Sequence, residues 1–265
     1  MILTKLLSLP DLQCYKNLDD PQTTLFHAKI IKEKALLKFF YLRCYKIFKR
    51  NIPRIDNHQK MVEIGSGGGF IKEIIPSAIT SDVLKLPNVD RHFSALKMPF
   101  NKDSLDVVFA IDVLHHLSDL EKFFKEIDRC LKVGGRLIAI EPANTVWSSF
   151  IYKNFHHEDF NPKTGWTFNS TGPLSCANMA LPWAVFVRDR KIFKQRFPQL
   201  IIKNIEYHTP LIYLLSGGFA TKQFVPNYFL PLVNLTEWLI SPLNKQLAMF
   251  MTITVEKSLR DQENN

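Results

Sequence analysis

The stretch Met61-Val-Glu-Ile-Gly-Ser-Gly-Gly-Gly-Phe70 decides the fold of this chain. Its apolar start predicts a short strand, its glycines predict a turn, and an apolar pattern of helical spacing begins at Phe70. Strand, glycine turn and helix form the layout of a small-molecule site. Glycines allow a positive φ and a close approach of the backbone to a ligand, and the first N–H groups of a helix suit a carboxylate or phosphate. We therefore expect a cofactor with an anionic end.

The spacing of the glycines distinguishes between cofactors. A dinucleotide fingerprint that begins at Gly65 requires a glycine at position 70, where the chain has Phe70. Residues 63–69 read acid-x-G-x-G-x-G, which resembles the first motif of the class I S-adenosylmethionine-dependent methyltransferases. The resemblance implies S-adenosyl-L-methionine as cofactor, with the acid seating its methionine end. The cofactor-binding residues implied in this turn are Glu63, Gly65, Ser66, Gly67 and Gly69. The alternative is a tight strand–helix connection without a ligand.

Asp82 is the predicted ribose ligand. Residues 78–81 read as a second strand that ends at this acid. At that place in an α/β nucleotide site, one carboxylate can accept hydrogen bonds from two neighbouring hydroxyls. The alternative is that Asp82 caps a helix or a turn.

Residues 93–100 and 103–117 are similar to a large branch of small-molecule methyltransferases, the type 11-like branch. Relatives usually carry an acid where this chain has Ser94, and that acid meets the adenine amino group. The resemblance thus implies Ser94 and Ala95 beside adenine, although Ser94 departs from the pattern. A helix expected over 121–131, a Gly-Gly turn and a strand over 136–142 extend the resemblance to about residues 60–142.

Residues 105–111 form a nearly continuous apolar run, which is typical of a central parallel strand buried on both faces. Asp112, His115 and His116 follow at its carboxyl end, the edge where α/β sheets bind ligands. We expect Asp112 to contact the cofactor and the two histidines to shape the methyl-transfer pocket. The competing interpretation is that both histidines cap and pack on the next turn.

The segments around this core predict a cap and two insertions. Residues 22–50 read as one long amphipathic helix or two short ones, within an N-terminal helical cap over 1–57. The methyltransferase domain is expected over 58–265. It contains an irregular acceptor lid over 143–184 and an apolar insertion over 209–246 between the last two strands. The predicted fold class is α/β, a Rossmann-like three-layer sandwich with a mostly parallel seven-stranded sheet and insertions after strands 5 and 6.

Composition narrows the classes of partner. The chain has 265 residues, 46% of them hydrophobic, which suits one catalytic domain. Its net charge of +9 suits an acidic substrate, an anionic membrane surface or nucleic acid, and residues 1–50 hold ten Lys/Arg against four Asp/Glu. A solvated basic helix face is the alternative. Enzymes that methylate exocyclic amino groups of nucleic-acid bases typically carry an Asp/Asn-Pro-Pro-aromatic motif after the fourth strand. This chain has Asp112-Val-Leu-His115 at that position. Nucleic acid is therefore not the expected partner.

Four single cysteines, Cys14, Cys44, Cys130 and Cys176, indicate neither a disulfide framework nor a metal site. Residues 1–10 are apolar but are interrupted by Lys5 and lack a cleavage site, so we expect no signal peptide. Prolines and an acid break the apolar stretch over 224–243, which makes it a poor membrane span. We expect a cytoplasmic protein, with peripheral contact to a membrane as a further expectation.

The predicted function is O- or N-methylation of a small or lipid-like acceptor. Methyl transfer needs alignment of the acceptor and removal of its proton. Candidate bases are His115, His116 and His156, together with His157 and Glu158, and no metal is expected. All four tryptophans lie after residue 143, which favours a bulky or apolar acceptor. The alternatives are an RNA methyltransferase and a non-catalytic binding protein. The 209–246 insertion is expected to meet lipid, acceptor, the protein's own core or a second subunit of a homodimer.

Overall fold

The computed structural model describes residues 17–53 and 59–259. The N-terminal stretch in which we expect no signal peptide, Cys14, and the expected boundary between residues 57 and 58 lie outside the described residues.

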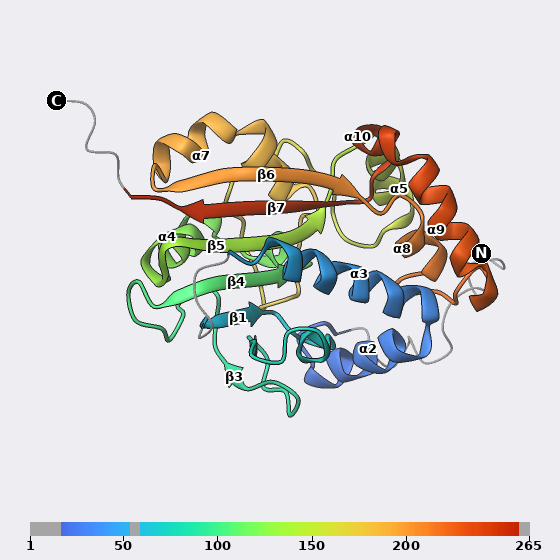
Figure 1. Ribbon diagram of the computed structural model, residues 1–265, viewed down its shortest axis with the longest axis horizontal. Coiled ribbons are helices and arrows are strands. Elements are labelled where there is room, and N and C mark those ends of the chain that lie inside the picture. Colours follow the sequence, from blue (N-terminus) through green and yellow to red (C-terminus); the bar gives the residue numbers. More distant parts are fainter. Residues whose placement is uncertain (1–16, 54–58, 260–265) are drawn as a thin grey trace.

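A seven-stranded sheet forms the centre of the molecule (Figure 1). Its order is β3-β2-β1-β4-β5-β7-β6, and neighbouring strands are parallel except that β7 runs antiparallel to β5 and β6. The predicted Rossmann-like, mostly parallel sheet is confirmed. The strands are β1 (Met61–Ile64), β2 (Ile79–Asp82), β3 (Arg91–His92), β4 (Leu105–Ile111), β5 (Leu131–Pro142), β6 (Leu200–His208) and β7 (Phe250–Lys257).

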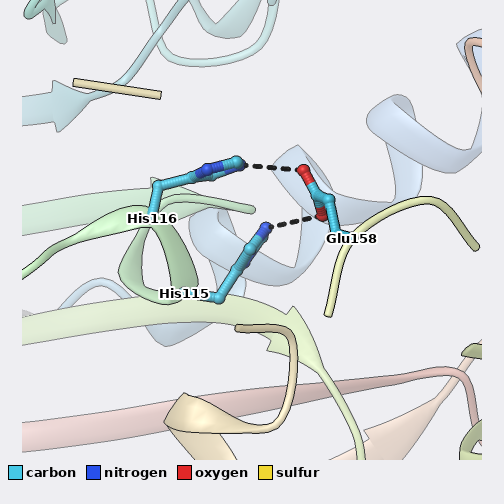
Figure 2. A group of neighbouring side chains, drawn as sticks. All are labelled: His115, His116 and Glu158. Atoms are coloured by element: carbon cyan, nitrogen blue, oxygen red, sulfur yellow. Dashed lines mark ion pairs between the residues drawn. The ribbon is translucent and has the colours of Figure 1, made fainter. Parts of the chain in front are cut away.

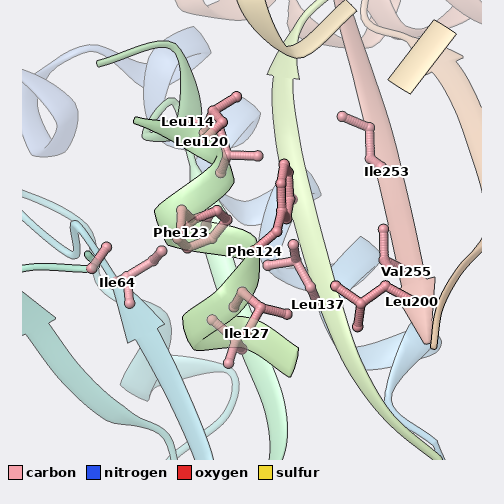
Figure 3. Packing of buried hydrophobic residues seen from close by; sticks show 14 of the residues in the cluster. Ile64, Leu114, Leu120, Phe123, Phe124, Ile127, Leu137, Leu200, Ile253 and Val255 are labelled. Carbon is pink, nitrogen blue, oxygen red and sulfur yellow. The ribbon is translucent and has the colours of Figure 1, made fainter. Parts of the chain in front are cut away.

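Helices cover both faces of the sheet, because the central strands are apolar on both sides. All of β4 is buried, as predicted: Val108 faces one hydrophobic core, while Val107 and Phe109 face the other. Figure 3 shows the first core, where Phe123 and Phe124 of the amphipathic helix α4 pack against the sheet. That side holds α4 (Leu120–Cys130), α6 (Leu181–Trp183), the π-helix η4 (Ala184–Arg188) and α7 (Arg190–Arg196).

The second core is built by the N-terminal cap and by helices of the two insertions. It contains residues of α2 (Pro21–Glu33), α3 (Ala35–Asn51), α5 (Val146–Phe155), α8 (Ile212–Ser216) and α9 (Leu230–Leu239). The remaining short helices are η2 (Ile71–Glu73), η3 (Leu114–His116), η5 (Asn227–Phe229), η6 (Ser241–Leu243) and α10 (Asn244–Leu247). The predicted three-layer sandwich is thus present, with insertions after β5 and β6.

The cap consists of two helices rather than one long helix. Asp20 begins α2, since its side chain accepts a hydrogen bond from Gln22 N at 2.9 Å. Lys34 has extended backbone angles and separates α2 from α3. Its side chain donates hydrogen bonds to the carbonyl oxygens of Gly218, at 2.6 Å, and Thr221. Lys34 is therefore buried, so the interpretation of this lysine as part of a solvated basic face is wrong.

Three local predictions differ from the structure. The short helix expected over residues 70–75, ending at Pro76, is only the single 3-10 turn η2. Strand β5 begins at Leu131 and includes the glycines expected as a separate turn. The last strand begins at Phe250 rather than Leu247, which ends α10.

The 209–246 insertion is largely helical, and many of its apolar side chains face solvent. Val233 of α9 is buried in the second core. Tyr228 is 76% exposed and Trp238 is 70% exposed. The protein's own core therefore covers only part of this segment. No helix within the described residues is both long and apolar enough to cross a bilayer.

Candidate active site

The glycine turn joins β1 to η2 at the carboxyl edge of the sheet. Gly65 and Gly67 have φ angles of +62° and +45°, which side chains rarely adopt, so both positions favour glycine. A Cβ at Gly65 would also lie 2.5 Å from Val113 Cγ2, which follows β4. Ser66 ties the turn to the neighbouring strand: its Oγ donates to Glu63 O at 3.2 Å and accepts from Ser81 N at 3.1 Å.

Gly68 and Gly69 also line the cavity, and their lack of side chains lets the cap pack closely against the turn. A Cβ at Gly68 would lie 2.7 Å from the Ala28 backbone of α2, and one at Gly69 would lie 2.3 Å from the hydroxyl oxygen of Tyr45. Phe70 N donates to that hydroxyl at 3.0 Å. The element after the glycines is thus the 3-10 turn η2 rather than the expected helix, and Phe70 N just before it is already bonded to Tyr45.

Asp82 lies at the end of β2, beside the glycine turn. Its Oδ2 accepts from Gly67 N and its Oδ1 accepts from Leu84 N, both at 2.9 Å. The carboxylate therefore performs the turn-capping role named as the alternative. It also lines the cavity described below, and each oxygen has a second lone pair for a ligand hydroxyl. Burial raises the pKa of Asp82, while these backbone bonds oppose the rise.

Glu63 is the clearest sign that a polar group of a ligand is needed at this turn. Its side chain lines the cavity, and its Oε2 is buried without a hydrogen-bond partner in the described part of the chain. Burial raises the pKa of Glu63 to about 8. A buried acceptor without a donor is costly, and the ammonium group of a bound S-adenosylmethionine would satisfy it. The residues present therefore fit this cofactor.

Ser94 and Ala95 lie on the same cavity, as the resemblance implies. Ser94 Oγ accepts from Leu96 N at 3.2 Å and so shapes its own loop. Asp112 also lines the cavity, with a positive φ of 53° that is unusual for a residue other than glycine. Burial raises the pKa of its carboxyl to about 8, and Glu141 and Glu158 add to this effect.

His115 is held by a glutamate that the sequence did not single out. Its Nδ1 lies 2.8 Å from Glu141 Oε2, and Glu141 Oε1 accepts from the backbone N of Val113 and Leu114. Although burial opposes it, the bond with Glu141 raises the pKa of His115 to about 9. An acid directly after the apolar run over 137–140 was the signal that could have indicated Glu141, because a buried carboxylate there requires partners.

Glu158 of the lid faces the two histidines of η3 (Figure 2). Its Oε2 lies 3.7 Å from His115 Nε2, and its Oε1 lies 3.6 Å from His116 Nε2. Burial lowers the pKa of His116 well below its ordinary value. His156 belongs to the same group, but its Nδ1 accepts from Glu158 N at 3.2 Å, and burial lowers its pKa to about 3. The structure therefore brings all predicted catalytic residues together, with Glu158 at their centre.

One cavity of about 830 Å³ connects the glycine turn with these histidines. The predicted site residues all lie on it, and so does Glu158. Its remaining wall is largely apolar and aromatic and comes from the cap, the lid and the insertion. Examples from these three segments are Tyr41, Ile151, Tyr152, Phe155, Tyr213, Phe219 and Phe224.

Comparisons with known proteins agree with this arrangement. Residues 55–139 match the family model described as a methyltransferase domain. The sterol 4-C-methyltransferase strm-1 of Caenorhabditis elegans is 37% identical over 68 residues, which make up 24% of this chain and 20% of that protein. The polyketide synthase-nonribosomal peptide synthetase TwmB of Talaromyces wortmannii is 33% identical over 98 residues, 35% of this chain and 3% of that protein. The chain thus spans a fifth or less of these relatives.

Solved structures share the fold at low sequence identity. A putative methyltransferase in complex with the Trm112 activator of Haloferax volcanii gives a TM-score of 0.53 at 14% identity, over 89% of this chain and 95% of that chain. Phosphoethanolamine N-methyltransferase 2 of Haemonchus contortus gives 0.50 at 17% identity, over 94% and 59% of the two chains.

The sheet order and the glycine-turn cavity define a Rossmann-like methyltransferase fold. Within it, residues 55–139 match the methyltransferase-domain family, in agreement with the resemblance to the class I S-adenosylmethionine-dependent methyltransferases. The family match confirms the resemblance and, with it, the expected cofactor class.

Proposed function

We propose that this protein transfers the methyl group of S-adenosylmethionine to a hydroxyl or amine of an apolar, lipid-like acceptor. One observation carries the proposal: the cavity has the glycine turn at one end and a largely apolar wall elsewhere. A bound S-adenosylmethionine supplies an electrophilic methyl group, so the protein has to orient the acceptor and exclude water. The volume of about 830 Å³ lies within the range of sites for drug-sized ligands.

The cofactor residues take the following roles in this proposal. Glu63 accepts from the cofactor's ammonium group, and Gly65, Ser66, Gly67 and Gly69 form the turn that its methionine end passes. Asp82 accepts from ribose hydroxyls with its free lone pairs. Ser94, Ala95 and Asp112 complete the wall around adenine and ribose. All of these residues line one cavity, which supports the assignment.

The acceptor's reacting atom is assigned to the place where Glu158 meets His115 and His116. These three side chains converge on the cavity at the carboxyl end of β4. His156 holds the Glu158 backbone, and its low pKa makes it a weak base, so we assign it a positioning role. Helices α2 and α3 of the cap and the lid over 143–184 then enclose both reactants.

The proposed acceptor reaches the cavity from a membrane surface. Helices α5, α9 and α10 lie at one end of the molecule (Figure 1), and α10 packs against α5. Helices α5 and α9 carry exposed apolar side chains, namely Phe150, Phe155, Leu232, Leu235, Trp238 and Leu239. Phe155 also lines the cavity, which therefore reaches this apolar end of the molecule. Exposed apolar clusters of this kind mark interaction surfaces, and Lys153 and Lys245 on the same helices suit anionic lipid.

Two measurements test the proposal. Calorimetry with S-adenosylhomocysteine should show stoichiometric binding, and radiolabelled S-adenosylmethionine incubated with a total lipid extract should yield labelled product in the organic phase. Label transferred to RNA instead would support the RNA methyltransferase alternative. Cofactor binding without any labelled product from lipid, RNA or small-molecule fractions would support the non-catalytic binding protein.

A further inference from the structure

The group formed by His115, His116 and Glu158 has the composition of a metal site. The potential ligand atoms of the three side chains lie within 4.8 Å of one another. Figure 2 shows both imidazoles directed at the Glu158 carboxylate, one at each oxygen. The side chains come from η3 and from the lid, two segments separated in sequence, and they meet on the cavity wall.

The distances within this group suit ligands of one ion better than partners in hydrogen bonds. The separations of 3.6 and 3.7 Å exceed those of ordinary hydrogen bonds. Zinc–nitrogen and zinc–oxygen bonds of about 2.0–2.2 Å place neighbouring tetrahedral ligands roughly 3.4 Å apart. A shift of a few tenths of an ångström in Glu158 would therefore complete the geometry.

The surroundings fix the orientation that a metal ligand needs. Glu141 binds His115 Nδ1 at 2.8 Å and leaves Nε2 directed at Glu158. Metal-binding histidines usually have such a carboxylate on their second nitrogen, where it fixes the ring and increases its basicity. On the other side, His156 Nδ1 holds the backbone of Glu158. His115 and Glu158 are thus each oriented by a residue outside the group.

Charge also favours a cation here. Glu141, Glu158 and Asp112 place three carboxyl groups around His115 within a largely buried region. A divalent ion would balance the Glu141 and Glu158 carboxylates and let His115 bind as a neutral imidazole.

We propose that His115, His116 and Glu158 bind one divalent transition-metal ion of the zinc or cobalt class. Two imidazoles with one carboxylate suit these ions better than magnesium or calcium, which prefer oxygen ligands. Three protein ligands leave at least one coordination position open toward the cavity. If the proposed function holds, on which this last step rests, the open position would bind the acceptor's hydroxyl and lower its pKa.

Titration of chelator-treated, metal-free protein with Co²⁺ tests the site without any turnover. We expect one equivalent to bind and to produce visible d–d absorption bands, which Zn²⁺ should then remove by competition. Glu158→Gln and His116→Ala should each weaken Co²⁺ binding by at least tenfold, whereas His92→Ala on β3, outside the cavity lining, should not change it.

The outcome separates this proposal from the proposed function. Wild-type protein without a stoichiometric Co²⁺ spectrum, or Glu158→Gln with unchanged Co²⁺ affinity, would overturn the metal site. Calorimetry with S-adenosylhomocysteine on the same samples reports cofactor binding independently. Retained binding of S-adenosylhomocysteine by Glu158→Gln also shows that this variant has folded, so a lost Co²⁺ spectrum then belongs to the site itself.

Discussion

Arg43 of α3 and Glu237 of α9 form an ion pair with an N–O distance of 2.5 Å, and this pair joins the cap to the 209–246 insertion. Glu237 is also bonded to the backbone of the insertion: its Oε1 accepts from Leu211 N and Ile212 N, each at 2.8 Å. The Glu237 side chain is only 5% exposed, so its removal would leave buried donors without partners. The pair therefore fixes the wall of the cavity against α3.

We predict that Glu237→Ala lowers the free energy of unfolding by about 3–5 kcal/mol, because it leaves a partly buried charge and two N–H groups unpaired. Urea denaturation measures this loss. Lys29→Ala is the matched control, since the Lys29–Glu33 pair is well exposed at 3.8 Å and contributes less than about 1 kcal/mol. Equal effects of the two substitutions would contradict the anchoring role of Glu237.

Gly67→Val should abolish binding of S-adenosylhomocysteine in calorimetry. The φ of +45° is unfavourable for valine, and the side chain would enter the cavity beside Asp82. The far-ultraviolet circular dichroism should stay unchanged, since Gly67 lies in a turn. Gly165→Ala is the control, because a Cβ there meets nothing within 4 Å. Normal cofactor binding by Gly67→Val would show that the ligand does not pass this turn.

Asp82→Ala should weaken cofactor binding by about tenfold to a hundredfold. Loss of a charged acceptor leaves ribose hydroxyls unpaired, at roughly 1.5–3 kcal/mol. Asp82 also holds Gly67 N and Leu84 N, so thermal unfolding without ligand has to be measured in parallel. A fall in stability with unchanged affinity would mean that Asp82 only caps the turn.

The contribution of Glu63 to stability should fall as the pH rises from about 5 to 8. The folded protein keeps a proton on Glu63, whose pKa is about 8, over a range in which the unfolded chain has lost it at its ordinary pKa of 4.5. The native state then binds more protons, and the free energy of unfolding decreases with pH by up to about 1.4 kcal/mol per unit. Asp112 contributes in the same direction. Glu63→Gln should flatten this slope in urea titrations at a series of pH values, and an unchanged slope would contradict an elevated pKa at Glu63.

The protein should float with anionic liposomes at low salt and less with neutral ones. Replacement of Leu235, Trp238 and Leu239 by serine should abolish flotation, because these exposed side chains supply the apolar contact. Val133→Ser, at an exposed position of β5, is the control. If the wild-type protein floats with neither kind of vesicle, membrane contact is contradicted. The partner of this surface would then be an acceptor free in solution or a second subunit.

The fold was predictable because its signals are local. The glycine turn over 63–69, the apolar run over 105–111 and the amphipathic helix after it each specify an element by their own pattern, and parallel strands then require the observed layers. The short helix expected over residues 70–75 is only the 3-10 turn η2, since periodicity over so few residues does not distinguish the two kinds of helix. Propensity also gave no indication that Lys34 is buried, since its partners Gly218 and Thr221 are distant in sequence.

The cavity residues were predictable in part. Asp112, His115 and His116 follow a central strand, so topology alone brings them to the ligand edge. The place of Glu158 depends on how an irregular segment folds back, which no periodicity determines. Glu141 was visible as an acid in a buried strand, yet its bond to His115 depends on the register between β4 and β5.

The contacts of Gly68 and Gly69 with Ala28 and Tyr45 have a consequence for protein engineering. The glycine motif is shaped on one side by the cap, so that α2 and α3 cannot be exchanged or shortened as if they were an accessory module. Removal of residues 1–53 would expose the apolar surface that α3 shares with β4. It would also leave the cofactor turn without the side chains against which it folds. The smallest fragment that retains cofactor binding should therefore begin before α2.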